Sequence, residues 1–148
     1  MLKVYLSGEI HTDWREQITA GAAGLDLVFS GPVTDHAASD DCGVALLGAE
    51  ADKFWHDRKG AQINAIRTRK GISDADVVVV RFGAQYKQWN AAFDAGFAAA
   101  LGKSLIILHE PDHAHALKEV DAAALAVAET PAQVVGILRY VLDGTLSA

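Results

Sequence analysis

The stretch ISDADVVVVRFGAQYKQWNAAFDAGFAAALGK, Ile72 to Lys103, decides the fold. Its run of four valines, Val77 to Val80, is β-branched and lacks polar alternation, which is typical of a central parallel strand covered on both faces. The residues after it predict a helix, Trp89 to Leu101, that begins at the carboxyl edge of the sheet. Ligands bind at this edge in open α/β sheets. Asp94, a carboxylate on that helix, is therefore the first candidate site residue.

Strands and helices alternate along the rest of the chain. The predicted strands are Lys3–Ser7, Asp26–Phe29, Val77–Phe82, Ser104–His109 and an edge strand Leu125–Ala128. The predicted helices are Asp13–Ala23, Asp52–Lys70, Trp89–Leu101, Ala114–Val120 and Thr130–Leu142. In the helix Asp52–Lys70 we expect a break or shift near Gly60, with Ile63, Ile66 and either Phe54 or Trp55 facing inward. Residues 35–48 have a weak pattern that indicates a loop with helical pieces. We expect one α/β domain over residues 1–148, a doubly wound parallel sheet with the flavodoxin-like strand order.

Composition and charge exclude several classes of protein. A chain of 148 residues with 51% hydrophobic content is long enough for one well-packed domain. The net charge of −6, without a run of Lys or Arg, argues against nucleic acid or an anionic membrane as partner and favours a small neutral or cationic ligand. One cysteine, Cys42, and the lack of a leader before the first strand indicate a cytoplasmic protein. No apolar run reaches the roughly 20 residues that span a bilayer.

The common cofactor motifs are absent from the sequence. There is no G-x-x-x-x-G-K-[ST] loop and no G-x-G-x-x-G after the first strand, which argues against a P-loop NTPase or an ordinary dehydrogenase. The segment HEPDHAH, residues 109–115, holds three histidines, but its proline disrupts the helical spacing of a zinc motif. We therefore expect neither a cofactor nor a metal ion.

The turn after the first strand, YLSGE, is the second candidate part of a site. Tyr5 and Ser7 lie two residues apart on a strand and project to one side, and Gly8 lets the backbone approach a ligand closely. Together with Glu9 these residues could hold a polar, partly aromatic molecule. The structural alternative is a helix cap beside a packed tyrosine.

The helix that carries Asp94 has two neighbouring rows of side chains. Asn90 and Asp94 lie one turn apart on one row, so the amide can hold the carboxylate in a single rotamer. The alternative is a solvated aspartate on a helix surface. The other row recurs every four residues and is expected to pack on the sheet: Trp89, Phe93, Phe97 and Leu101.

The order of these motifs resembles the nucleoside 2-deoxyribosyltransferase superfamily. The chain has Y-L-S-G-E at the first strand, S-D-A-D-V-V-V-V at the buried strand and N-A-A-F-D-A-G-F-A-A-A-L-G-K-S-L-I-I-L after it. This resemblance spans roughly Leu2 to His109. Over nearly its whole length the chain resembles the YtoQ family, which is placed beside that superfamily.

The resemblance implies that the helix carboxylate attacks the anomeric carbon and forms a glycosyl-enzyme ester. Asp94 stands where the superfamily pattern has glutamate, and one methylene less retracts the carboxylate by about 1.5 Å. A retaining transfer also needs a proton donor for the leaving base, for which Glu9, Asp76 and His56 are candidates. Asp76 has a structural alternative as well, because aspartate often bonds nearby backbone N–H groups.

The implied function is an N-glycosidic-bond enzyme, a nucleoside or nucleotide hydrolase or deoxyribosyltransferase, with a nucleoside or nucleotide as its small-molecule partner. The expected site residues are Asp94 and Glu9 for catalysis, and Tyr5, Ser7, Gly8, Asp76 and Asn90 for substrate binding. The alternative is a non-catalytic domain of the same fold that binds a nucleotide-like ligand or a protein partner. Superfamily members usually form dimers or larger rings, so the resemblance also implies a homo-oligomer.

Overall fold

Five parallel strands form the centre of the computed structural model, which describes residues 1–52, 54, 57–85 and 88–146. The strands are β1 Leu2–Gly8, β2 Leu27–Ser30, β3 Val77–Arg81, β4 Ser104–Leu108 and β5 Ala126–Ala128. Their order, β2-β1-β3-β4-β5, confirms the predicted flavodoxin-like sheet, with the valine run in its central strand. In this order the crevice for ligands is expected where β1 and β3 meet, because the chain changes direction across the sheet there.

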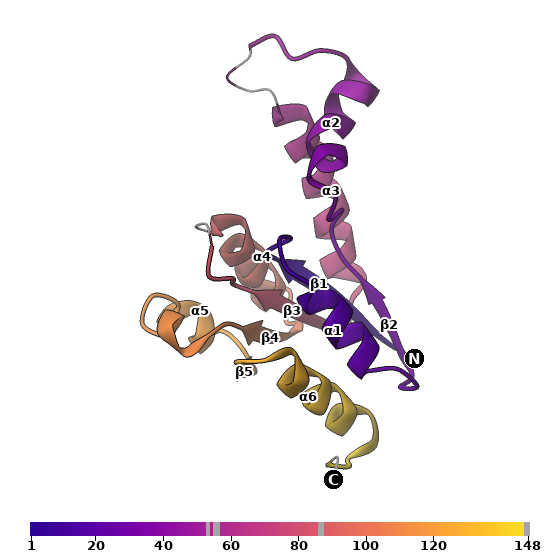
Figure 1. Cartoon of the computed structure of the whole chain (residues 1–148), viewed down its shortest axis with the longest axis vertical. Helices are drawn as coiled ribbons and strands as arrows, with labels where there is room; N and C mark the ends of the chain where they lie inside the picture. The colour runs from indigo at the N-terminus through magenta and orange to yellow at the C-terminus, as the bar shows by residue number, and fades with distance from the viewer. Residues whose placement is uncertain (53, 55–56, 86–87, 147–148) are drawn as a thin grey trace.

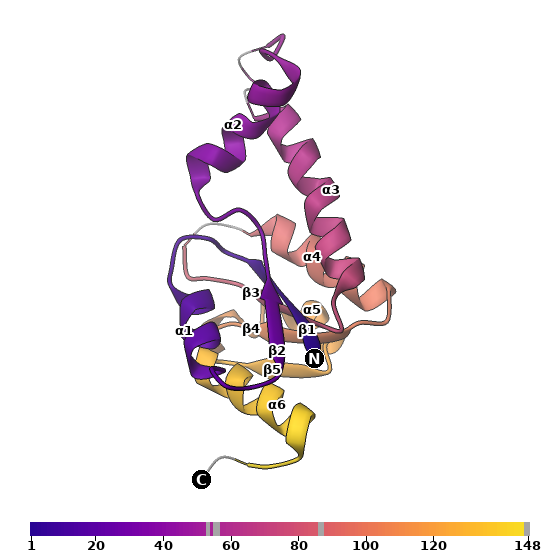
Figure 2. The ribbon, with the colours of Figure 1, turned by 90° about the vertical axis from the view of Figure 1, so that its right-hand side faces the viewer.

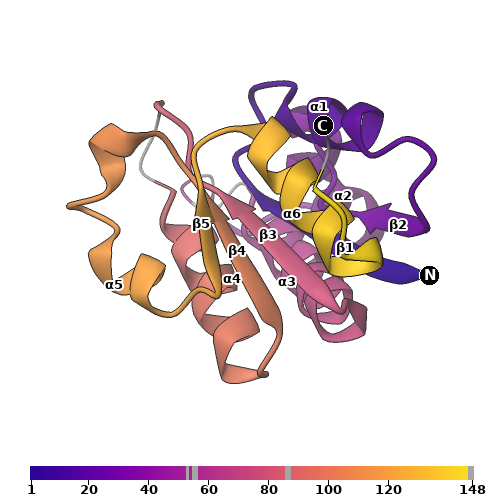
Figure 3. The same ribbon diagram turned by 90° about the horizontal axis from the view of Figure 1, so that it is seen from below.

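Helices cover both faces of the sheet, as the alternating pattern predicts. The helices are α1 Trp14–Gly21, α2 His36–Leu47, α3 Arg58–Asp74, α4 Trp89–Ala100, the short 3-10 helix Pro111–His113, α5 Lys118–Ala122 and α6 Pro131–Asp143. Figure 3 shows α1 and α6 on one face and α3 and α4 on the opposite face. In the part of the chain that the structure describes, every helix is too short or too polar to cross a lipid bilayer.

Alternating strand residues supply two separate cores. Val4 and Leu6 of β1 join the core that holds Trp14 of α1 and Leu138 of α6. The residues between them point the other way, because successive side chains of a strand face opposite sides. Tyr5 accordingly packs in the second core, beneath α3 and α4. The side chains of β1 that face α4 are therefore Tyr5 and Ser7, as expected from their spacing.

Helices α2 and α3 pack together and project beyond the sheet (Figures 1 and 2). Their backbones touch at two glycines: a Cβ on Gly43 would lie 2.1 Å from the amide nitrogen of Gly60. The Asp35 side chain caps α2 by accepting a hydrogen bond from Ala38 N at 2.7 Å. Residues 36–47 are thus a regular helix rather than the loop with helical pieces expected. The glycine contact and the cap stabilise it without an apolar stripe.

Two expectations for the predicted helix Asp52–Lys70 are also wrong. Helix α3 begins at Arg58, later than predicted, so the expected break or shift near Gly60 is a later start, with Gly60 in the first turn. Ile66, expected to face inward, is 71% exposed. Ile63 is half-buried and Phe54 is exposed, whereas Trp55 and His56 lie outside the described residues.

Candidate functional site

The orientation of α4 on the sheet differs from the expected one. Its buried row consists of alanines, Ala91, Ala95 and Ala98, whereas Trp89 is 75% and Phe93 is 61% exposed. The prediction that the aromatic row packs on the sheet is therefore wrong for Trp89 and Phe93, whereas the partly buried Phe97 does pack against the core beneath α4. Small side chains allow the helix backbone to approach the strands closely, which aromatic rings in the same place would prevent.

This orientation brings Asp94 to the end of β1. The Ser7 hydroxyl donates a hydrogen bond to Oδ2 of Asp94 with an oxygen–oxygen distance of 2.5 Å. Burial raises the pKa of the Asp94 carboxyl above its usual range, and the bond from Ser7 opposes that rise. Asp94 is thus a partly desolvated carboxylate with a defined position, which is the kind of group that functional sites tend to hold.

Two cavities, of about 510 and 390 Å³, adjoin each other at Asp94. Both are lined by Ser39, Thr68, Asn90 and Asp94. The larger lies between α3 and α4 and is also lined by Asp40, Asp57, Asn64, Arg69 and Phe93. The smaller lies between α4 and the loop after β1 and is also lined by Ser7, Gly8, Glu9, His11 and Gln88. We refer to the two together as the Asp94 cleft, which lies at the carboxyl ends of β1 and β3.

Gly8 brings the loop after β1 against the end of β3. Its φ of 109° is one that residues with a side chain rarely adopt. A Cβ at this position would lie 2.2 Å from the carbonyl oxygen of Arg81. Glycine is therefore required here for the close approach of two strand ends, which forms one wall of the cleft.

The Glu9 carboxylate is saturated with hydrogen bonds. It accepts from the backbone N–H groups of His11 at 2.7 Å and Thr12 at 3.1 Å, from the Thr12 hydroxyl, and from Nε of Arg81 at 3.2 Å. Burial raises the pKa of Glu9, but these hydrogen bonds outweigh it and hold the pKa below its usual range. Glu9 is consequently ionised at neutral pH. This arrangement suits the stabilisation of the loop rather than the expected donation of a proton.

Two residues of α1 hold the same loop from beneath the sheet edge. The guanidinium of Arg15 donates to the carbonyl oxygens of Leu6 at 3.0 Å, Gly8 at 3.1 Å and Glu9 at 2.6 Å. The indole N–H of Trp14 donates to the Glu9 carbonyl at 2.9 Å. Burial lowers the pKa of Arg15 to about 10, so its charge is retained at neutral pH. This clamp was not predictable from the sequence, because its contacts depend on how α1 folds back under β1.

Of the other predicted site residues, some line the Asp94 cleft and others lie elsewhere. Asn90 lines the Asp94 cleft, but Tyr5 lines a different cavity beneath α3. Asp76 precedes β3 at the amino edge of the sheet, where its carboxylate accepts the N–H of Lys3 at 2.9 Å. The structure therefore does not bring Asp76 to the cleft, and its contact is the backbone cap weighed as an alternative. His56 lies outside the described residues.

Some residues that line the cleft were not predicted from the sequence. His11, Thr68 and Arg69 are among them. His11 follows the YLSGE turn by two residues, a signal that could have included it. Thr68 and Arg69 lie on α3, whose position over the cleft has no local signature in the sequence.

The histidine-rich segment after β4 has a structural contact of its own. His109 is buried, with Nε2 2.9 Å from a carboxylate oxygen of Asp121 and Nδ1 2.6 Å from the carbonyl oxygen of Glu110. These contacts tie the end of β4 to α5. Over the described ranges, no group of three or more His, Cys, Asp or Glu side chains is placed to hold a metal ion.

Comparison with known proteins places this chain in a family. A solved 2-deoxyribosyltransferase from Bacillus psychrosaccharolyticus has a similar fold, with a TM-score of 0.55 and 14% identity over 90% of each chain. The Bacillus subtilis (strain 168) protein named "Uncharacterized protein YtoQ" is 40% identical over 142 residues, which cover 95% of this chain and 96% of that protein. The family model described as nucleoside 2-deoxyribosyltransferase YtoQ matches residues 5–142. The chain therefore belongs to the nucleoside 2-deoxyribosyltransferase YtoQ family.

Proposed function

We propose that the protein cleaves the N-glycosidic bond of nucleosides, with Asp94 as the nucleophile. The observation that carries this proposal is the Asp94 carboxylate itself, which is partly desolvated, held by Ser7 at 2.5 Å and placed where two cavities adjoin. Cavities of this size suit a sugar and a base on either side of the carboxylate. Membership of the YtoQ family supports the same assignment.

The proposed reaction has two steps. Asp94 attacks C1′ of the sugar, the bond between C1′ and the base nitrogen breaks, and the electron pair leaves with the base. Water or a second base then attacks C1′ and releases the carboxylate. The first step also requires a proton for the leaving base. His11 lines the smaller cavity, and an imidazole can act as a general acid, so we assign it this role in the proposal.

The charges around the cleft favour an uncharged nucleoside over a nucleoside monophosphate. Among the described lining residues, Asp40, Asp57 and Asp94 face one cation, Arg69, in the larger cavity. In the smaller cavity, the charge of Glu9 is paired with Arg81. A phosphate group would therefore meet repulsion in the larger cavity.

A panel of nucleosides and their 5′-monophosphates tests the proposal. Each compound is incubated with the protein, alone and with a second free base, and released base is measured by chromatography. We expect base release from at least one nucleoside, slower release from its monophosphate, and none with Asp94→Asn. Exchange of the second base into the sugar distinguishes transfer from hydrolysis. No base release from any compound would contradict the proposal.

One observation favours the alternative of a binding domain without catalysis. Glu9 is held ionised by its hydrogen bonds, so the acid expected beside Asp94 cannot supply a proton at neutral pH. Calorimetric binding of a nucleoside without any turnover would support this alternative. Loss of turnover in His11→Ala with binding retained would instead support the enzyme.

We also propose that the protein self-associates through the outer faces of α4 and the α2–α3 pair. Large exposed apolar side chains lie on both elements: Leu46 at 70% and Leu47 at 61% on α2, and Trp89 at 75% and Phe93 at 61% on α4. Exposed apolar residues of this size are typical of interfaces. Light scattering should show a species larger than the 15.7 kDa chain, and Phe93→Glu should weaken it. A monomer at micromolar concentration would overturn this proposal.

A further inference from the structure

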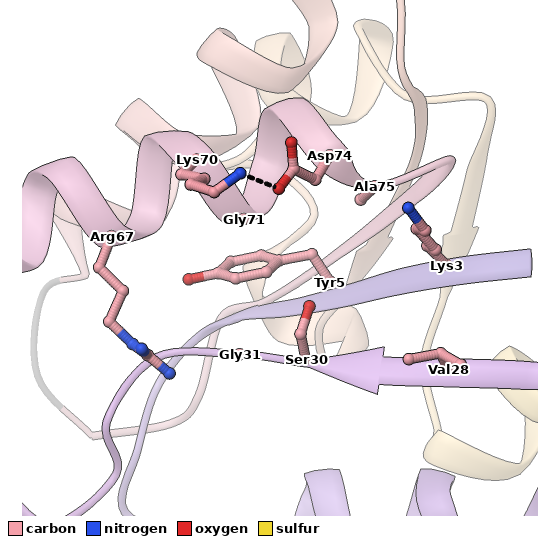
Figure 4. A pocket seen from close by; sticks show the side chains of 10 residues that line it. All are labelled: Lys3, Tyr5, Val28, Ser30, Gly31, Arg67, Lys70, Gly71, Asp74 and Ala75. Carbon is pink, nitrogen blue, oxygen red and sulfur yellow. Dashed lines mark hydrogen bonds and ion pairs between the residues drawn. The ribbon is translucent and has the colours of Figure 1, made fainter.

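A further cavity, of about 290 Å³, lies beneath the carboxyl-terminal half of α3, outside the Asp94 cleft. Figure 4 shows its floor on β1 and β2 and its roof on α3. Its walls are partly apolar, with the Tyr5 ring, Val28 and Ala75. The α3 residues that line it lie on a different face of the helix from those that line the Asp94 cleft. The two cavities therefore use separate sets of side chains.

The charge of this cavity is opposite to that of the whole chain. Three cationic side chains, Lys3, Arg67 and Lys70, and one carboxylate, Asp74, line it in a protein of net charge −6. Lys70 is occupied, because its ammonium lies 2.5 Å from Asp74. The side chains of Lys3 and Arg67 form no hydrogen bond or ion pair with a residue that the structure describes. Figure 4 shows Arg67 extending from α3 toward the segment that carries Gly31.

Tyr5 adds an unused hydrogen-bond donor to these cations. The residue is 2% exposed, and its hydroxyl makes no hydrogen bond of ordinary geometry within the described part of the chain. Such a buried group costs about 1–3 kcal/mol when it is left without a partner. Burial raises the pKa of Tyr5; a hydrogen bond from the Thr68 side chain opposes that rise and the negative charge of Asp94 adds to it, so the hydroxyl keeps its proton at neutral pH. In Figure 4 this hydroxyl points toward the Arg67 end of the cavity.

The position of the Tyr5 ring depends on a glycine of α3. A Cβ on Gly71 would lie 2.3 Å from Cε2 of Tyr5, so any side chain there would displace the ring. One edge of the ring therefore lies against the helix backbone, with the hydroxyl directed along the cavity (Figure 4). This packing fixes the donor in one place, which reduces the entropic cost of binding a ligand to it.

We propose that this cavity binds a small organic anion through its phosphate or carboxylate group, with Arg67 and the Tyr5 hydroxyl as the principal contacts. A guanidinium forms paired hydrogen bonds with either group, and Lys3 adds a second unpaired charge nearby. The apolar walls contact the body of the ligand. The volume lies at the small end of the range for ligand pockets, which suits a compact phosphomonoester or carboxylate. Asp94 does not line this site.

Inorganic phosphate and acetate are suitable probes, titrated separately at constant ionic strength with chloride. Amide NMR signals report the site, in particular those of Gly31 and Gly71, which line the cavity. We expect saturable shifts below about 10 mM ligand for at least one probe. Preference for phosphate or for acetate identifies the anionic group, and saturable binding of either supports the proposal.

Two variants and a matched control locate the binding. Arg67→Gln should weaken the affinity about tenfold or more, and Tyr5→Phe about threefold or more, because each removes one contact to the anion. Tyr5→Phe deletes only the hydroxyl and keeps the ring that packs in the core, so it should leave the fold intact. Arg69→Gln is the control, since Arg69 lies on the same helix but lines the Asp94 cleft. Absence of saturation, an affinity that either variant leaves unchanged, or equal weakening by Arg69→Gln would overturn the proposal.

Discussion

The loop after β1 and the inner face of α4 each present one carboxylate to the same cavity, in contrasting environments. Glu9, on the loop, accepts four hydrogen bonds, and its pKa is lowered. Asp94, on the helix, is bonded by Ser7, and burial raises its pKa. Saturation with donors stabilises the charged form, whereas desolvation leaves a carboxylate with free lone pairs. On this difference we base the proposal that Glu9 supports the structure of the site and that Asp94 carries its chemistry.

The largest expected effect separates the two carboxylates by turnover. Asp94→Asn removes the proposed nucleophile and should lower kcat/KM for base release by about 10³-fold or more. Glu9→Gln changes only the support of the loop, and we expect a loss of less than about tenfold. Steady-state kinetics on the best nucleoside of the panel measures both. Equal losses in the two variants would remove the distinction between them.

The next largest expected effect is on the stability of the protein when Glu9 is replaced. An amide cannot accept all four of its hydrogen bonds, so Glu9→Gln should cost about 2 kcal/mol of unfolding free energy at pH 7. Because the pKa of Glu9 is lowered in the folded protein, this stabilisation is present above the pKa of the unfolded chain and is lost as the pH falls through the folded value. Urea unfolding at pH 7 and at acid pH measures the difference.

Glu119→Gln provides the control for this measurement. Glu119 lies exposed on α5, and its replacement should change stability by less than about 0.5 kcal/mol. A difference between Glu9→Gln and the parent that grows as the pH falls would contradict the structural role of Glu9.

A smaller effect is expected from the hydroxyl that holds Asp94. Ser7→Ala removes a hydrogen bond that lowers the pKa of the carboxyl, so that pKa should rise further. The acid limb of the pH profile of kcat/KM should then move to higher pH, because more of the nucleophile is protonated. At pH 7 we expect a loss of about three- to tenfold. An unshifted acid limb would show that Asp94 does not set the profile.

The smallest expected effect is the change in stability caused by Asp94→Asn. The raised pKa means that the folded protein binds the proton more tightly than the unfolded chain does. The parent therefore loses stability as the pH rises from the unfolded pKa through the folded one, and the asparagine variant does not. At pH 7 the variant should be as stable as the parent or more stable, by about 1 kcal/mol at most. A clearly less stable variant in urea would indicate a structural role for Asp94.

The sequence was sufficient to predict the strand order and the helix that carries Asp94. The valine run allows burial on both faces, and the alternating pattern admits few topologies. The orientation of α4 was not predictable from its period, which shows that Trp89 and Phe93 share a face but not that this face is buried. The alanine row competes with it and packs closer to the sheet. The hydrophobicity of the residues alone does not predict the stabilisation that comes from the close approach of the alanine row to the sheet.

The role of Glu9 was also not predictable from the sequence. Its partner Arg81 is 72 residues away and reaches it because β1 and β3 are neighbours. The backbone donors at positions 11 and 12 depend on the conformation of the loop, which Gly8, Trp14 and Arg15 set together. A residue type can be predicted to carry chemistry, but its protonation state depends on contacts that the fold creates.

The most direct test of the account is detection of the ester on Asp94. The protein is mixed with an active nucleoside or with a slower analogue that carries fluorine at C2′, quenched in acid, and examined by intact-mass and peptide mass spectrometry. We predict a mass increase equal to the glycosyl group, located on the peptide that contains Asp94 and absent from Asp94→Asn. Base release by the parent with no such adduct, together with continued release by Asp94→Asn, would contradict the assignment of Asp94 as the nucleophile.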